Sequence, residues 1–211
     1  MDVKISVQHG EKLNTFTHFI AAILFSYGVG LLISTAIAKD DLARIVTCLV
    51  YGASTIGIYV LSVLYHGSFG ERKNLFRRLD YIGIYFKIAG SYTPYAILAI
   101  RGVEGWSVLA TVWLLAVIGV YNEIFIQART RWFANFIYLV MAATVLPVIH
   151  RLFMAIPQQG FALIMLGFIS YAIGFWFFLH DDKIKHGHGI WHMLVIGGSA
   201  CHYLCLQMYV I

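Results

Sequence analysis

Charged residues are scarce in this sequence. Only 12% of the 211 residues are Asp, Glu, Lys or Arg, whereas 60% are hydrophobic. This composition excludes an ordinary soluble domain, of which roughly 25% is charged, and is typical of a polytopic membrane protein. The net charge of +5 does not indicate a nucleic-acid partner, because the basic residues lie in short loops between apolar runs, where they set membrane topology. We therefore expect membrane lipid, and no nucleic acid, among the partners of this chain.

Cysteine and proline are also few. Cys48, Cys201 and Cys205 all lie in apolar segments, where thiols pack as small hydrophobic groups, and no disulfide framework is implied. Pro94 and Pro147 lie inside apolar runs and are expected to kink their helices. The first apolar run has no small-residue cleavage pattern, so we do not expect a signal peptide.

Seven apolar runs follow a polar stretch of residues 1–15, which we expect to form a short cytoplasmic lead-in along the membrane surface. Each run is close to the ~20 residues that a helix needs to cross ~30 Å of hydrocarbon. The runs cover residues 16–38, 43–65, 79–99, 106–125, 133–149, 161–179 and 189–210. They must be helices, because backbone groups in lipid have no water to bond. The sequence thus predicts an all-α fold, a single seven-transmembrane helix bundle over residues 1–211.

The basic residues orient this bundle. Ten of them lie before the first run or in the second, fourth and sixth loops: Lys4, Lys12, Arg72, Lys73, Arg77, Arg78, Arg129, Arg131, Lys183 and Lys185. The other side carries four, namely Lys39, Arg44, Arg101 and Arg151. Cytoplasmic loops carry the excess of Lys and Arg. We therefore expect a multi-pass protein of the plasma (inner) membrane, with a cytoplasmic N-terminus and the C-terminus outside.

The last apolar run contains three histidines. His188 and His192 are one helical turn apart on the same face, a spacing at which two imidazoles can hold one metal ion. His202 lies ten residues beyond His192, about 15 Å along the axis at ~1.5 Å per residue, and cannot reach that ion. Polar residues in membrane helices also serve to bind neighbouring helices. Two histidines near one helix start, with more polar partners elsewhere, favour a site.

Helix parity brings further polar residues to the same level as His188 and His192. Helix ends that are distant in sequence contribute Glu11, His18, Ser62, His66 and Asp80. Helix ends are also polar where they meet lipid head groups, but this explains Ser62, His66 and His192 poorly, because they belong to apolar runs. Three imidazoles form a nearly neutral ligand set that suits zinc, with a fourth position open to water.

Other polar residues near this level have alternative roles. A closed structural zinc site needs a fourth ligand, for which His18 and Asp80 are the candidates. Asp80 is better placed to bond the metal-bound water or orient a histidine, and Ser62 can donate to the same water. Lys87, about 10 Å deeper than Asp80 at ~1.5 Å per residue, either snorkels to the interface or contacts a lipid head group or carboxylate. Glu123 is expected at the surface. The alternative is that it lines the vestibule beside the histidines.

With these residues, the chain resembles the hemolysin III proteins, the bacterial branch of the progestin and adipoQ receptor family. Three separated motifs carry the resemblance: Glu11-x-x-Asn14-x-x-Thr17-His18, then Ser62-x-x-x-His66 with Leu79-Asp80-Tyr81-x-Gly83 and Gly90-Ser91-x-x-Pro94, and finally His188-x-x-x-His192 with His202. The resemblance implies a seven-helix fold. It also implies zinc bound by His66, His188 and His192, with Ser62 and Asp80 around the metal-bound water. The chain lacks the long N-terminal extension of the adiponectin receptors, so we do not expect hormone binding.

Several functions agree with this reading. Zinc with an open position polarises a carbonyl and activates water, which predicts a hydrolase of lipid amides or esters with Asp80 as general base. The resemblance points the same way, through relatives linked to ceramidase activity. It also implies a sensor or regulator of membrane energetics or fluidity, in which zinc is a structural link. A cytolytic pore is less expected from a resident helical bundle, and a transporter lacks support from an inverted repeat.

Overall fold

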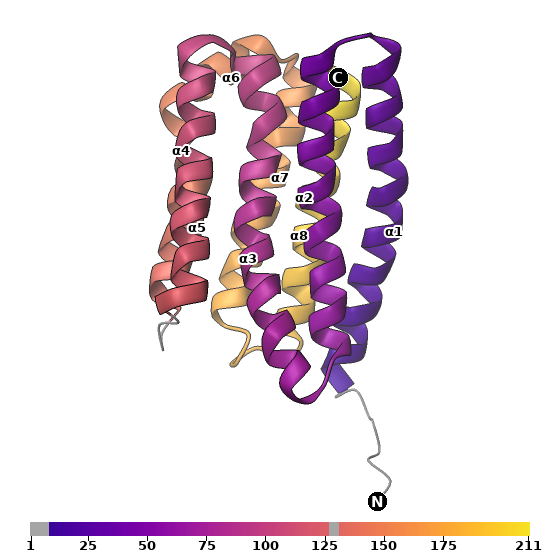
Figure 1. Cartoon of the computed structure of the whole chain (residues 1–211), viewed down its shortest axis with the longest axis vertical. Coiled ribbons are helices and arrows are strands. Elements are labelled where there is room, and N and C mark those ends of the chain that lie inside the picture. Colours follow the sequence, from indigo (N-terminus) through magenta and orange to yellow (C-terminus); the bar gives the residue numbers. More distant parts are fainter. Residues whose placement is uncertain (1–8, 127–130) are drawn as a thin grey trace, which may run out of the picture.

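Seven helical segments run between the two ends of a bundle in the computed structural model, which describes residues 9–126 and 131–211 (Figure 1). The long helices are α1 (His9–Ala38), α2 (Leu42–Gly67), α3 (Gly70–Pro94), α4 (Gly102–Tyr121), α5 (Trp132–Ala143), α7 (Gln158–Leu179) and α8 (Gly187–Cys205). Shorter turns extend or join them: η1 (Tyr95–Ile100), η2 (Asn122–Ile126), η3 (Leu146–Val148), α6 (Ile149–Ala155) and η4 (Leu206–Val210). No strand occurs among the described residues, so the predicted all-α class is confirmed.

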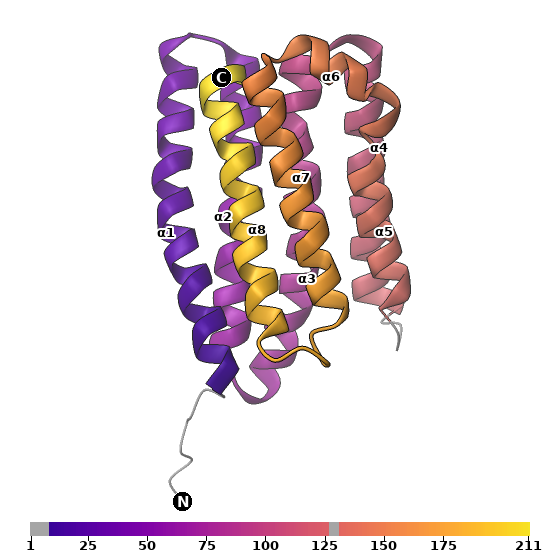
Figure 2. The same cartoon turned by 180° about the vertical axis from the view of Figure 1, so that it is seen from behind.

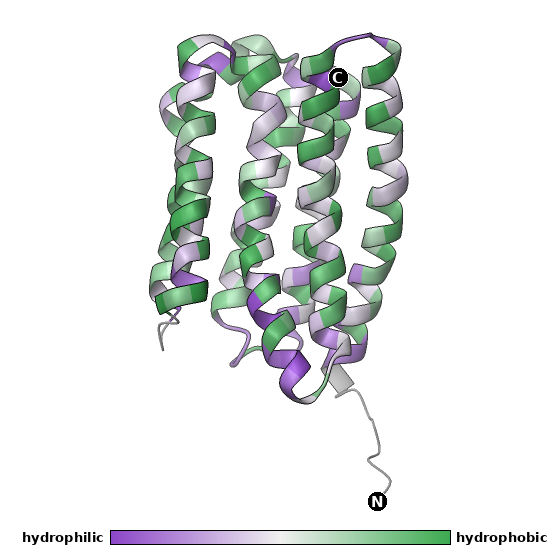
Figure 3. Cartoon of the chain, viewed as in Figure 1, coloured by the Kyte–Doolittle hydropathy of each residue, from purple (hydrophilic) through white to green (hydrophobic). Residues whose placement is uncertain are grey.

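The length and apolarity of these segments fit a membrane. Six segments of the described chain are long and apolar enough to span one, and only α3 with η1 falls short by composition. The reason is that the first turns of α3 carry Arg72, Arg77 and Asp80, yet α3 and η1 together cover the height of the bundle (Figure 1). Large apolar side chains such as Leu24 and Leu114 are exposed on the outside. Hydrophilic residues gather at the ends, most densely where α2 turns into α3 (Figure 3).

Helix α8 closes the bundle by lying between α1 and α7 (Figure 2). Because the number of crossings is odd, the C-terminus lies at the opposite end from the start of α1 (Figure 1). The Lys39 ammonium donates to the carbonyl oxygen of Ile211 and ties the C-terminus to the turn between α1 and α2. In the same turn, the Arg44 backbone N–H donates to the Asp41 carboxylate at 3.1 Å, which caps α2 and lowers the pKa of Asp41.

Two helices begin earlier than the sequence predicts. Helix α1 starts at His9 instead of near residue 16, so the expected lead-in of residues 1–15 is helical from His9 onward, and residues 1–8 lie outside the described residues. Tertiary contacts explain the extension, because Asn14 is buried and Glu11 pairs with Lys73 of α3. Helix α3 likewise starts at Gly70, well before residue 79. Apolarity marks only the part of a helix that meets lipid, and these helices continue past it.

The two internal prolines change the helical hydrogen-bonding pattern. After Pro94 the third segment continues as the π-helix η1, which ends with an Arg101 N–H bonded to the Ala96 carbonyl five residues back. Pro147 lies in the 3-10 turn η3, and the predicted fifth span is broken there into α5 and α6. Proline has no N–H and its ring clashes with the preceding turn, so it disturbs the regular α-helical hydrogen bonding around it. The helix type thus changes at each of the two prolines for which the sequence predicts a kink.

Candidate metal centre

Two helix ends bring three histidines together. His66 lies in the last turn of α2, and His188 and His192 lie in the first two turns of α8. Because α2 ends at the same end of the bundle where α8 begins, residues more than 120 positions apart become neighbours. Each imidazole offers one nitrogen, and these three ligand atoms lie within 4.8 Å of one another. Ring centroids are 4.6 Å apart for His188 and His192, and 4.9 Å for His66 and His192.

The burial of these rings leaves nitrogens without partners. His66 is 3% exposed and His192 is 2% exposed, whereas His188 lies half-buried at the rim. Nε2 of His66 and Nδ1 of His192 are buried and have no hydrogen-bond partner. A buried polar atom without a partner costs about 1–3 kcal/mol, so such atoms call for a ligand. Three imidazoles with ligand atoms this close, two of which have a buried nitrogen without a partner, fit a zinc ion.

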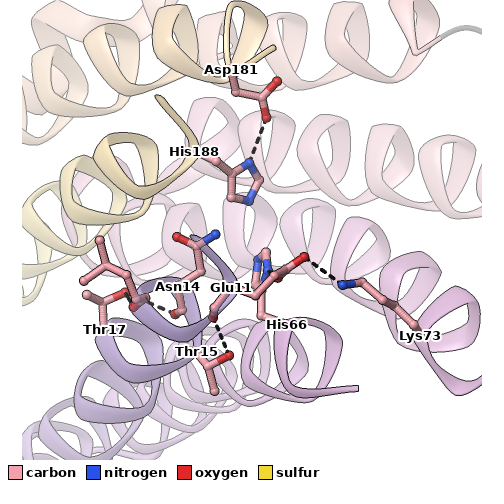
Figure 4. A network of polar contacts seen from close by, with 9 residues as sticks. Glu11, Asn14, Thr15, Thr17, His66, Lys73, Asp181 and His188 are labelled. Atoms are coloured by element: carbon pink, nitrogen blue, oxygen red, sulfur yellow. Dashed lines mark hydrogen bonds and ion pairs between the residues drawn. The ribbon is translucent and has the colours of Figure 1, made fainter. Parts of the chain in front are cut away.

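Two carboxylates bond the outer ring nitrogens of His66 and His188 (Figure 4). Nδ1 of His66 bonds to the Glu11 carboxylate of α1, which also accepts from the Lys73 ammonium at 2.7 Å. Nδ1 of His188 donates to Asp181 at 2.9 Å, from the turn that precedes α8. A carboxylate on the outer nitrogen fixes the tautomer and ring orientation of a histidine and makes its inner nitrogen a better ligand. This arrangement leaves Nε2 of both histidines available to a metal.

His18 stacks against the cluster without joining it. Its ring stacks on that of His192, with ring centroids 3.7 Å apart. It also makes an edge-to-face contact with Tyr59, with ring centroids 5.1 Å apart. Both ring nitrogens are buried without a hydrogen-bond partner. Within the described part of the chain, the group of ligand atoms inside 4.8 Å contains only the three histidines, so the structure brings neither His18 nor Asp80 to the fourth position.

Ser62 and Asp80 form a pair beside the cluster. Ser62 is buried one turn before His66, and its hydroxyl lies against the Asp80 carboxylate of α3. Asp80 is partly buried and lies within the electrostatic range of Arg131, at the start of α5. The structure therefore places both residues at the level predicted from helix parity, with Asp80 outside the ligand group.

Three other predicted polar residues have partners outside the cluster. His202 is buried among Tyr95, Phe168 and Tyr171, far along α8 from His192. Lys87 does not snorkel, because its side chain is 6% exposed and donates to the Thr55 hydroxyl at 3.0 Å inside the bundle. The expectation of a surface position for Glu123 is wrong, since its side chain is 11% exposed and pairs with Arg131 at 3.0 Å. Desolvation inside a packed bundle makes such a partner necessary.

Two contributors to the cluster were not identified from the sequence. Asp181 lies in the turn before α8, seven residues from His188, so helical spacing gave no sign of its contact. In this turn His186 adopts a left-handed conformation with φ 64° just before α8. Lys73 was counted only as a topology signal, although it bonds to Glu11. Both contacts depend on the geometry of turns, which the apolar pattern does not encode.

These features define an integral membrane protein of the helical-bundle class with a candidate metal centre at one end of its helices. The family model described as "Haemolysin-III related" matches residues 6–203, and the chain belongs to this family. The chain is similar to "Hemolysin-3" of Bacillus cereus, with 36% identity over 202 residues that cover 95% of this chain and 92% of that protein. The "Hemolysin-3 homolog" of Bacillus subtilis (strain 168) is 33% identical over 200 residues, which cover 94% and 93%.

A more distant likeness extends to animals. The "Monocyte to macrophage differentiation factor" of Homo sapiens is 26% identical over 202 residues, covering 93% of this chain and 82% of that protein. These matches span nearly the whole chain, so they cover all three motifs from which the resemblance was inferred. The predicted family membership is confirmed.

Proposed function

We propose that this chain is a zinc-dependent membrane hydrolase that cleaves amide or ester bonds of lipids. The observation that carries the proposal is the cluster itself: three imidazoles with ligand atoms within 4.8 Å, two of them with buried nitrogens that have no partner. No fourth protein ligand lies in this group among the described residues, which favours a catalytic over a closed structural site. The lipid substrate follows from the position of the cluster at the ends of membrane-spanning helices.

The residues of this chain have separate tasks in the proposed reaction. A zinc ion bound by His66, His188 and His192 would supply Lewis acidity and lower the pKa of a water molecule. Glu11 and Asp181 orient two of the three rings through their Nδ1 atoms. Asp80 accepts the proton of the attacking water as general base and returns it to the leaving group. Ser62 lies against Asp80 and holds its carboxylate in position.

The test is lipid hydrolysis by the purified protein. A natural lipid extract is incubated with the protein, with and without a zinc chelator, and the products are identified by mass spectrometry. Asp80→Asn keeps the size of the side chain but removes its basicity, so it should retain zinc and lose turnover by about 10²–10⁴-fold, or roughly 3–5 kcal/mol of barrier. Asp40→Asn, the same change at an exposed position in the turn at the opposite end, is the matched control and should have wild-type turnover.

A second function, a sensor or regulator of membrane state with a structural zinc, has one observation in its favour. The three histidines come from α2 and α8, so a bound metal would also cross-link helices from distant parts of the chain. In that case Asp80→Asn would keep both zinc and biological output, while His66→Ala would lose both. A zinc-loaded Asp80→Asn protein with full output would remove the hydrolase proposal in favour of the sensor.

A further inference from the structure

An apolar groove of about 350 Å³ lies on the outer surface where α2, α3 and α4 meet. Helix α2 forms its floor from Val50 to Leu61, while Gly83 and Phe86 of α3 and Trp113 of α4 form its walls. Phe86 and Trp113 face each other with ring centroids 6.1 Å apart. The groove shares no residue with the histidine cluster or with the Ser62–Asp80 pair, so it is a separate feature of the molecule.

The lining offers an occupant only apolar contacts. Its one hydroxyl belongs to Ser54, which already donates to the Tyr51 carbonyl oxygen at 2.9 Å. Gly57 keeps the floor low. No atom lies within 4 Å of its Cβ position, so a side chain there would project into the open space of the groove. Helices α2 and α4 both qualify as membrane spans, so the groove lies at hydrocarbon depth. A concave apolar surface at that depth, without a free polar group, fits a hydrocarbon chain.

The groove lies along the middle of α2. Val50 and Leu61 are eleven residues apart, which is about 16 Å along the helix at ~1.5 Å per residue. This is roughly half of the ~30 Å hydrocarbon thickness. The groove begins eight residues after the start of α2 and ends six residues before its end, so it crosses the middle of the membrane and lies slightly nearer the histidine end. Leu61 lies five residues before His66, so the groove ends about 7.5 Å short of the histidine level at ~1.5 Å per residue.

We propose that this groove binds one acyl chain of a lipid that enters from the histidine side of the membrane and reaches past the midplane. A chain whose tail lies along Val50 to Leu61 continues past Leu61, so that its carbonyl end lies between Ser62 and His66. The identification of this lipid as the substrate rests on the proposed hydrolase function, whereas acyl-chain binding itself does not. The groove would then select acyl lipids and hold their ester or amide bond at the depth of the candidate metal centre.

The test is photochemical labelling of the full-length protein in vesicles. The probe is a phosphatidylcholine with a diazirine at the middle of one acyl chain, and labelled peptides are mapped by mass spectrometry. Wild-type protein should be labelled more strongly on the α2 and α3 residues of the groove than elsewhere on the outer surface. Gly57→Phe fills the groove from its floor and should abolish this labelling. Gly30→Phe is the matched control, because Gly30 of α1 also has no atom within 4 Å of its Cβ position, and it should leave groove labelling unchanged.

The outcomes separate the groove from the hydrolase. Uniform labelling of the outer surface in wild-type protein, or undiminished groove labelling in Gly57→Phe, would overturn the acyl-chain site. Groove labelling that is lost in Gly57→Phe, in a protein that hydrolyses no lipid, would support the site and refute the hydrolase instead. Zinc content is measured in both variants as a control. Neither position contacts the histidine cluster, so both proteins should bind metal like the wild type.

Discussion

The contact between Glu11 and His66 leads to a quantitative prediction about metal affinity. Glu11 bonds Nδ1 of His66 and also accepts from Lys73, so its carboxylate fixes the ring whose Nε2 is free for zinc. Glu11→Gln keeps an oxygen that accepts from His66 but removes the negative charge that makes the ring a stronger ligand. We expect this protein to fold and to bind zinc more weakly.

The expected loss follows from the type of contact and its burial. Carboxylates that bond the outer nitrogen of a metal-binding histidine contribute about 10–100-fold to affinity, or roughly 1.4–2.7 kcal/mol. The His66 side chain is 3% exposed and that of Glu11 is 19% exposed, so solvent screens this pair little. The second pair, His188 and Asp181, is 30% and 36% exposed. Asp181→Asn should therefore cost less than Glu11→Gln, under about tenfold, because water screens exposed pairs.

The measurement is competition for zinc against a chromophoric chelator in detergent, on both variants and the wild type. Glu104→Gln is the matched control, because Glu104 pairs with Arg151 at the opposite end of the bundle and its side chain is 44% exposed. It should bind zinc like the wild type. Wild-type affinity in Glu11→Gln, or a larger loss in Asp181→Asn than in Glu11→Gln, would refute the reasoning.

Further predictions concern the ligands, the topology and the packing. Elemental analysis should show that His192→Ala has lost most of its zinc. His202→Ala should retain zinc, because His202 lies about 15 Å from His192 at ~1.5 Å per residue. Full zinc in His192→Ala would contradict the ligand assignment. A reporter fused to Ile211 should be found outside the cell, given the odd number of crossings and the basic residues, and a cytoplasmic signal would reverse the orientation. Gly90→Ala should lower the free energy of unfolding by about 1–3 kcal/mol, because the new Cβ would lie 2.0 Å from the Ser54 hydroxyl oxygen. Gly57→Ala should be tolerated, because no atom lies within 4 Å of its Cβ position. Equal melting temperatures for these two variants would show that α2 and α3 can separate freely.

The differences between expectation and structure share one physical cause. Apolarity reports contact with lipid, so it located α2 and α7 well but missed the first turns of α1 and α3, which are held by polar contacts beyond the hydrocarbon. The sequence predicts that Lys87 either snorkels to the interface or contacts a lipid head group or carboxylate, because an isolated ammonium in lipid is costly. In the bundle it reaches Thr55 instead, a partner that becomes available only when α2 packs against α3.

The sequence by itself determined the class of the protein and the level of its site. Twenty-residue apolar runs in lipid have no alternative to helices, and the parity of seven such helices places His66, His188 and His192 at one end of the bundle. Only the tertiary structure decided which groups touch. It brought the three imidazoles within 4.8 Å, stacked His18 beside them, and supplied Glu11 and Asp181 to their outer nitrogens. Depth along a helix follows from counting residues, whereas contact depends on the rotation of each helix and the path of each turn, which packing sets.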